Sequence, residues 1–127
     1  MKPNKTPYKN QKKIHDLILS ELKKSYLNNI KEAYVIGSLV NGNFGVYDEE
    51  YEGYKGSDID VVIITEKINK AWKYEGDFYD WHKAYLAGEI KIEKTRHPIK
   101  LLIPINNDIQ LFFNKAKELN WKIEKLK

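Results

Sequence analysis

The chain has 127 residues, no cysteine, and 22 lysine and arginine residues against 18 aspartate and glutamate residues, for a net charge of +4. This length suits one domain with a single core. The lack of cysteine excludes disulfides, zinc–thiolate sites and a cysteine nucleophile. The sequence has neither the roughly 20 apolar residues of a membrane span nor the apolar run of a signal peptide, so we expect a cytoplasmic protein with no membrane partner.

The first part of the chain predicts one long helix and a short strand. Thr6-Pro7 is a helix-start signal, because a capping hydroxyl precedes a proline at the first helical position. Apolar residues then recur at helical spacing, which predicts a helix from Tyr8 to Leu27. The segment Lys31 to Ile36 predicts a strand that ends before a glycine. Gly37 to Gly45 follows and is rich in turn residues.

The middle of the chain contains the strongest strand signal. Tyr47 to Tyr54 is acidic and aromatic, and we interpret it as a loop. Asp58 to Thr65 is rich in β-branched residues, which predicts a strand buried on both faces beyond its first positions. Asp77 to Ala87 predicts a helix, with Asp77 as its cap and Gly88 as its end.

The last third alternates strand and helix signals. Glu89 to Lys94 alternates polar and apolar residues and predicts a half-exposed strand, with a tight turn at Thr95-Arg96. Pro98 to Pro104 predicts the next strand. Asp108 to Leu119 has a capping residue and helical periodicity, and predicts a helix. Trp121 to Leu126 fits either a short terminal strand or a continuation of the helix.

Helices and strands are intermixed along the chain, without an internal repeat or a linker. We therefore expect a single α+β domain over residues 1–127, with a small mixed β-sheet that helices cover mainly on one face.

Two aspartates at the start of the central strand are the main candidates for chemistry. Side chains alternate across a strand, so Asp58 and Asp60 face the same way while Ile59 and Val61 point into the core. Two carboxylates about 7 Å apart along a strand repel each other, and they suit the oxygen-ligand preference of Mg²⁺. The alternative is a solvated strand end, where acids protect a sheet edge.

A glycine–serine pair follows the preceding strand. Gly37 allows close approach of a ligand to the backbone, and Ser38 offers a hydroxyl where a helix would begin, with free N–H groups that favour a phosphate. A Gly-Ser pair alone is typical of an ordinary strand-to-helix turn. Here it precedes Ser57-Asp58-Ile59-Asp60 at the start of the next strong strand.

This combination resembles the signature of the nucleotidyltransferase superfamily, the DNA polymerase β-like fold, in its minimal form. The family pattern is a hydrophobic residue with Gly-Ser, a loop, and Asp-hydrophobic-Asp, which this chain has at Ile36-Gly37-Ser38 and at Asp58-Ile59-Asp60. The resemblance covers about residues 34 to 65.

The resemblance implies a nucleoside monophosphate transfer from a nucleoside triphosphate such as ATP. Asp58 and Asp60 would be catalytic and would hold Mg²⁺, or Mn²⁺ in its place. Gly37, Ser38, Gly42 and Ser57 would lie in the nucleotide-binding part of the site.

The chain departs from the family pattern in three places. Many minimal members, antitoxins among them, carry an arginine near the second glycine, where this chain has Asn41 and Asn43 on either side of Gly42. Residues 46–55 form an insertion, which would be a lid, a contact surface or a simple surface loop.

Active members carry a third carboxylate on a later strand, and Lys100 stands in the middle of the candidate strand. Glu93, which shares a face with Glu89 on the strand before it, is our candidate for the third catalytic acid; the alternative is that both are surface acids.

Two other functions stay open from the sequence. One is a non-catalytic nucleotide-binding or antitoxin-like module of the same fold, which would act with a protein partner or as a homo-oligomer. The other is nucleic-acid binding through the lysines, which are spread along the chain. An aromatic cluster between residues 72 and 85 either stacks a base or forms a core edge or dimer surface.

Overall fold

The computed structural model describes residues 2–78 and 81–127. The helices of this part are α1 (Gln11–Ser25), α2 (Ser38–Asn41) and α3 (Ile109–Leu119), with a 3₁₀ turn at Ile105–Asn107. Its strands are β1 (Lys5–Pro7), β2 (Ile30–Ile36), β3 (Gly45–Tyr51), β4 (Tyr54–Gly56), β5 (Ile59–Thr65), β6 (Lys73–Phe78), β7 (His82–Ile92), β8 (Thr95–Pro104) and β9 (Glu124–Lys125). No helix of the described residues is long and apolar enough to span a membrane.

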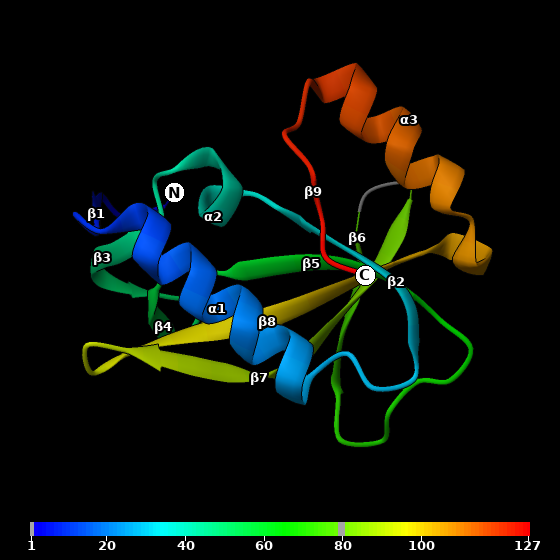
Figure 1. Cartoon of the computed structure of the whole chain (residues 1–127), viewed down its shortest axis with the longest axis horizontal. Coiled ribbons are helices and arrows are strands. Elements are labelled where there is room, and N and C mark those ends of the chain that lie inside the picture. Colours follow the sequence, from blue (N-terminus) through cyan, green and yellow to red (C-terminus); the bar gives the residue numbers. More distant parts are fainter. Residues whose placement is uncertain (1, 79–80) are drawn as a thin grey trace.

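Two β-sheets organise the molecule (Figure 1). The larger sheet has the strand order β6-β7-β8-β5-β2-β9, and β1, β3 and β4 form the smaller one. β5 runs parallel to β8 and antiparallel to β2. Mixed α+β architecture, expected from the sequence, is therefore confirmed.

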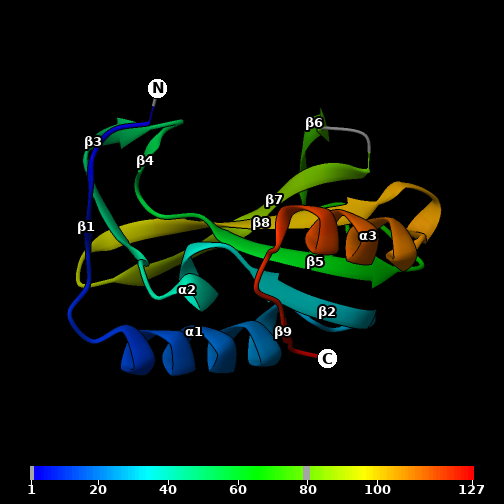
Figure 2. The same ribbon diagram turned by 90° about the horizontal axis from the view of Figure 1, so that it is seen from above.

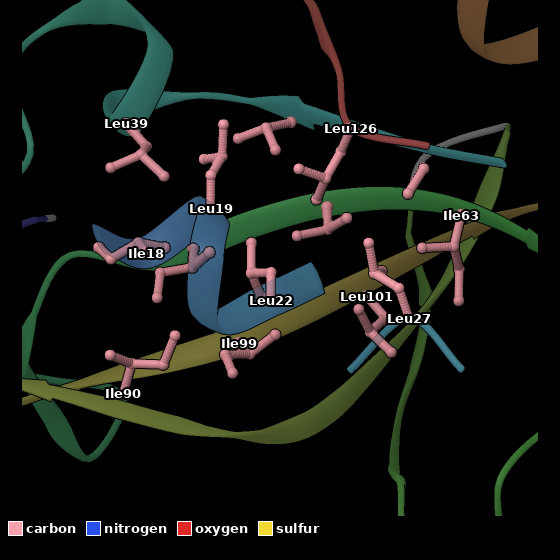
Figure 3. Packing of buried hydrophobic residues seen from close by; sticks show 14 of the residues in the cluster. Ile18, Leu19, Leu22, Leu27, Leu39, Ile63, Ile90, Ile99, Leu101 and Leu126 are labelled. Carbon is pink, nitrogen blue, oxygen red and sulfur yellow. The ribbon is translucent and has the colours of Figure 1, made fainter. Parts of the chain in front are cut away.

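Helices lie on both faces of the larger sheet, which corrects the prediction that they cover mainly one face. The side chains of α1 pack with Ile59, Val61 and Ile63 of β5 in the main core. Figure 3 shows part of this cluster, including Ile18 and Leu22 of α1 and Ile63 of β5. A second cluster on the opposite face joins α3 to alternate residues of β2 and β5, among them Tyr34 and Val62. Figures 1 and 2 show the separate positions of α1 and α3.

Four predicted elements agree with the structure: the strands at residues 31–36, 58–65 and 98–104 and the helix at 108–119. Asp108 caps α3, because its carboxylate accepts a hydrogen bond from the Gln110 N–H at 3.1 Å. The terminal segment takes the strand alternative, since β9 pairs with β2.

The N-terminal prediction is wrong in where the long helix begins. α1 starts at Gln11, and Thr6-Pro7 belongs to β1, which pairs with β3 in the register Pro7↔Gly45. Proline is tolerated there because β1 is an edge strand. Gly45 is needed for this pairing, because a Cβ at that position would lie 2.1 Å from the Thr6 carbonyl oxygen.

The segment predicted as a loop at residues 47–54 is a β-hairpin. β3 and β4 are joined by Glu52 and Gly53, whose φ angles of 52° and 89° are both positive. Two positive φ values in a two-residue hairpin turn match the right-handed twist of the strands. The 46–55 insertion is thus an ordered part of the smaller sheet.

The helix predicted at residues 77–87 is also wrong. Its described residues belong to β6 and β7, except for Trp81 in the turn before β7, and residues 79 and 80 lie outside the described part. β7 is an eleven-residue strand that pairs with both β6 and β8, and aromatic residues favour such pairing. The following turn falls at Glu93-Lys94, both with positive φ, and not at Thr95-Arg96.

Candidate functional site

The site is built on the face of the sheet opposite α1. Strand β5 buries Ile59, Val61 and Ile63 against α1, so the alternate side chains of Asp58 and Asp60 emerge on the other face. Both aspartates line one pocket with a volume of about 470 Å³. This is within the usual size of small-molecule sites.

Three kinds of side chain surround the pocket, namely acids, one lysine, and a wall of aromatic and aliphatic groups. The lining residues are Ile36, Glu52, Asp58, Asp60, Glu75, Phe78, Trp81, His82, Ala84, Lys100, Leu102 and Trp121. They come from both sheets and from the segment after α3, so the pocket depends on the complete fold.

Gly37 lies directly against Asp60. A Cβ atom on Gly37 would be 2.9 Å from the Asp60 Oδ2 atom. The backbone at Gly37 has φ 82° and ψ −153°, a conformation that is essentially limited to glycine. The Gly37 turn and the acid pair are therefore brought together, and glycine is required there by both space and conformation.

The other residues of the predicted nucleotide site have different positions. Ser38 is half-buried and opens α2. Gly42 closes α2 in a left-handed conformation and is exposed, and a Cβ added at Gly42 would meet nothing within 4 Å. Gly42 therefore ends the short helix and does not border the pocket.

Ser57, predicted to lie in the nucleotide-binding part of the site, does not line the pocket and makes hydrogen bonds within the fold. Its side chain is only 1% exposed. Its hydroxyl donates to the Gly45 carbonyl and accepts from the Gly45 N–H, both at 3.0 Å. These two bonds hold the smaller sheet against the start of β5, next to Asp58.

Burial shapes the electrostatics of the two aspartates. Desolvation, followed by the charge of Asp58, raises the pKa of Asp60 to about 7. Desolvation also raises the pKa of Asp58, while the charge of Lys100 opposes that rise. At neutral pH, the second negative charge is therefore costly unless a cation offsets it.

A lysine lies next to the acid pair on the neighbouring strand. Lys100 of β8 is the direct partner of Asp60 in the parallel register, and its ammonium forms an ion pair with the Glu75 carboxylate of β6. The side chains of Lys100 and Glu75 are 13% and 23% exposed, so this pair belongs to the pocket wall and not to the open surface.

Glu93, predicted as the third acid, does not line this pocket. It lies in the turn between β7 and β8, is exposed, and lines two shallow surface pockets near α1 and β1. The acids that do share the pocket with Asp58 and Asp60 are Glu52 and Glu75. Sequence reasoning missed both, because it placed Glu52 in a loop and gave no structure to the segment around Glu75.

Two histidines are buried near the site. His82 lines the pocket, and burial lowers its pKa to about 4. His97 lies outside the pocket; its Nδ1 is 2.9 Å from the Ser57 carbonyl oxygen, and its Nε2 is 2.8 Å from the Tyr8 hydroxyl. Burial lowers the pKa of His97 to about 4 as well, so it serves as a neutral link between β1, β4 and β8.

The aromatic wall lies beside the acids. Trp81 is 2% exposed and its ring lies 5.6 Å from Phe112 and 6.0 Å from Trp121. Phe78 is 42% exposed at the pocket edge and stacks on His82. Of the aromatic residues predicted to act together, Phe78 and Trp81 line the pocket; Tyr79 lies outside the described residues.

Asp58 and Asp60 are the residues that could hold a divalent cation as a partly hydrated ion. Across residues 2–78 and 81–127, no group of three or more histidine, aspartate or glutamate side chains is arranged to hold a metal. Mg²⁺ does not need such a group, since it commonly takes one or two carboxylates and fills its shell with water and phosphate oxygens. Asp58 and Asp60, two desolvated carboxylates in one pocket, offer that number of ligands.

Comparison of the chain with protein-family models, curated proteins and solved structures finds no significant match.

Proposed function

We propose that this chain is a Mg²⁺-dependent nucleotidyltransferase that moves a nucleoside monophosphate from a nucleoside triphosphate, such as ATP, to an acceptor. The observation that carries the proposal is the contact between the Gly37 turn and Asp60, with Asp58 and Asp60 in one pocket. This is the arrangement that the resemblance to the nucleotidyltransferase superfamily implies.

Different residues of the pocket would bind the cation and the nucleobase. Asp58 and Asp60 would hold the cation, and the lack of a side chain at Gly37 leaves the space that the Asp60 carboxylate occupies. Phe78 and Trp121 provide apolar ring surface at the other part of the pocket, where a nucleobase would stack. Bound Mg²⁺ would offset the negative charge that builds up on the phosphates during transfer.

The reaction has a simple balance. An acceptor oxygen attacks the α-phosphorus, the bond from that phosphorus to the bridging oxygen breaks, and pyrophosphate leaves. The acceptor hydroxyl gives up its proton. Because Glu75 is paired with Lys100, Glu52 is the pocket acid that we assign to receive that proton.

The test follows the label from ATP. Protein incubated with α-³²P-labelled ATP, Mg²⁺ and cell lysate should transfer label to an acceptor and release pyrophosphate. The double variant Asp58→Asn/Asp60→Asn keeps the side-chain shapes but removes both charges, and should transfer none. The matched control Asp108→Asn changes an exposed helix cap and should transfer normally. Equal labelling by the double variant would reject the proposal.

A second candidate function is a non-catalytic nucleotide-binding module that works with a protein partner. The observation in its favour is the Lys100–Glu75 pair, because a lysine stands beside Asp60 on the strand from which a third carboxylate was expected. In that case ATP with Mg²⁺ would bind, and Asp58→Asn/Asp60→Asn would weaken binding, while no label would leave ATP.

A further inference from the structure

The pocket contains a fixed cation of its own. Lys100 and Asp60 are direct neighbours on the parallel strands β8 and β5. Both side chains line the pocket, so they lie on the same face of the sheet. The ammonium of Lys100 is thus built into the floor of the site, one strand away from the acid pair.

Glu75 fixes this ammonium in place. It pairs with Lys100 from β6, on the side away from β5, and both side chains are largely buried. The Glu75 carboxylate offsets part of the cost of burying the Lys100 ammonium. The charge of Lys100 also acts on both aspartates, because it opposes the rise of their pKa values.

We propose that the Lys100 ammonium replaces a second metal ion, so that the pocket binds one divalent cation at Asp58 and Asp60 and not two. This inference rests on the proposed function, because it assumes a cation at that pair. Sites with two metals hold the ions roughly 3.5–4 Å apart and need further carboxylates for the second ion. Here the acid on that side, Glu75, is already paired with Lys100.

The other described residues also favour a single divalent cation. No cluster of three or more metal-binding side chains occurs in the described ranges 2–78 and 81–127. A second divalent ion near Asp60 would have to approach a fixed positive charge while sharing ligands with the first ion. Coulomb repulsion between these charges disfavours such binding at any distance within the pocket.

The experiment counts Mn²⁺ ions on the purified protein by calorimetry and by electron paramagnetic resonance. The wild type should bind one ion, with no spin–spin broadening. Lys100→Met removes the charge and keeps the length, so it should still bind one ion but on the order of tenfold more tightly. Lys100→Asp supplies an extra carboxylate and should bind a second ion with spin–spin broadening.

The matched control is Lys31→Asp. Lys31 forms an exposed ion pair with Glu66 near the opposite end of β5, so the variant changes the net charge equally but away from the pocket. It should keep a single ion with wild-type affinity. If Lys100→Asp does not fold, as judged by circular dichroism, the wild-type count and the Lys100→Met affinity carry the test.

The outcomes separate this inference from the proposed function. Two spin-coupled ions on the wild type, or an unchanged affinity in Lys100→Met, would overturn the role of Lys100 and leave the nucleotidyltransferase proposal standing. Failure of the wild type to bind any Mn²⁺ would overturn both.

Discussion

The two faces of the central strand β5 differ in chemistry: one carries buried apolar side chains and the other carries acidic side chains. On the α1 face, Ile59, Val61 and Ile63 are fully buried among apolar side chains. On the other face, Asp58 and Asp60 line an open pocket beside charged groups. The alternation of a strand separates these surfaces by a single residue.

The two faces contribute differently to the free energy of unfolding. The α1 face gains free energy by burying apolar surface. The pocket face places two carboxylates where burial raises their pKa values, which costs free energy at neutral pH. We expect apolar truncations on the first face to lower stability, and substitutions of the acids on the second face to change ligand binding and the pH dependence of stability.

The largest effect should come from a core truncation on β8. Leu101 is 1% exposed and packs in the α1 core, so Leu101→Ala should lower the free energy of unfolding by roughly 2–5 kcal/mol. Its neighbour Leu102 is half-buried on the pocket face, and Leu102→Ala should cost less, because its site is already open. Urea unfolding followed by circular dichroism compares the two. Equal losses would contradict the assignment of the faces.

A smaller loss of stability is expected at the contact between the turn and the acid. Gly37→Ala introduces a Cβ 2.9 Å from Asp60 Oδ2 and strains a backbone that only glycine adopts easily, at a cost of roughly 1–3 kcal/mol. It should also weaken Mn²⁺ binding, because Asp60 must move. The control Gly42→Ala has open space and should cost about 1 kcal/mol with unchanged Mn²⁺ affinity. The same Mn²⁺ affinity in both variants would argue against Asp60 as a ligand.

Parts of the fold could be predicted because their signals are local. The β-branched residues predict β5, and the capping residue with helical spacing predicts α3, without reference to any other segment. The strands β3, β6 and the first half of β7 could not be predicted, because they depend on pairing with partner strands that the local sequence pattern does not identify. Their polar and aromatic residues fit a helix or a loop equally well when the partner strands are unknown.

The distinction between local and long-range signals also explains which site residues could be predicted. Asp58 and Asp60 are two residues apart on one strand, so their common face follows from period two alone. Glu52, Glu75 and Lys100 come together only through the hairpin β3–β4 and the order β6-β7-β8-β5. The prediction of Glu93 rests on its position in a predicted strand, but the β7–β8 turn carries it away from the pocket.

The pH dependence of stability should show the cost of the pocket face. Asp60 has a pKa raised to about 7, so the folded protein holds a proton that the unfolded chain loses near pH 4. This contribution to stability is complete below pH 4 and is lost as the pH rises to about 7 and above. Asp60→Asn should therefore melt several degrees above the wild type at pH 8 and close to it at pH 4.

Comparing the wild type with Asp60→Asn also removes the contribution of the two buried histidines to the pH dependence. The buried histidines His82 and His97 have pKa values lowered to about 4, so they destabilise both proteins as the pH falls from 6.5 to 4. The difference in melting temperature between wild type and Asp60→Asn cancels that trend. A difference that shrinks as the pH rises would show that Asp60 is not desolvated as the structure indicates.

The smallest expected effect is on Mn²⁺ affinity, and it distinguishes two glutamates in equivalent turns. Glu52 and Glu93 each open a two-residue hairpin turn, with φ angles of 52° and 47°. Only Glu52 lines the pocket, where its charge raises the pKa of Asp58. Substitution by asparagine, which tolerates positive φ, should change stability by less than about 0.5 kcal/mol in each case.

Mn²⁺ titration then isolates the electrostatic contribution of the pocket. Glu52→Asn should weaken binding by roughly two- to threefold, an effect that fades at high salt because the charge is exposed. Glu93→Asn should leave the affinity unchanged at every salt concentration. Equal weakening by the two variants would mean that net charge, and not the position of an acid beside Asp58, governs cation binding, and the separation of the two faces would then have no functional meaning.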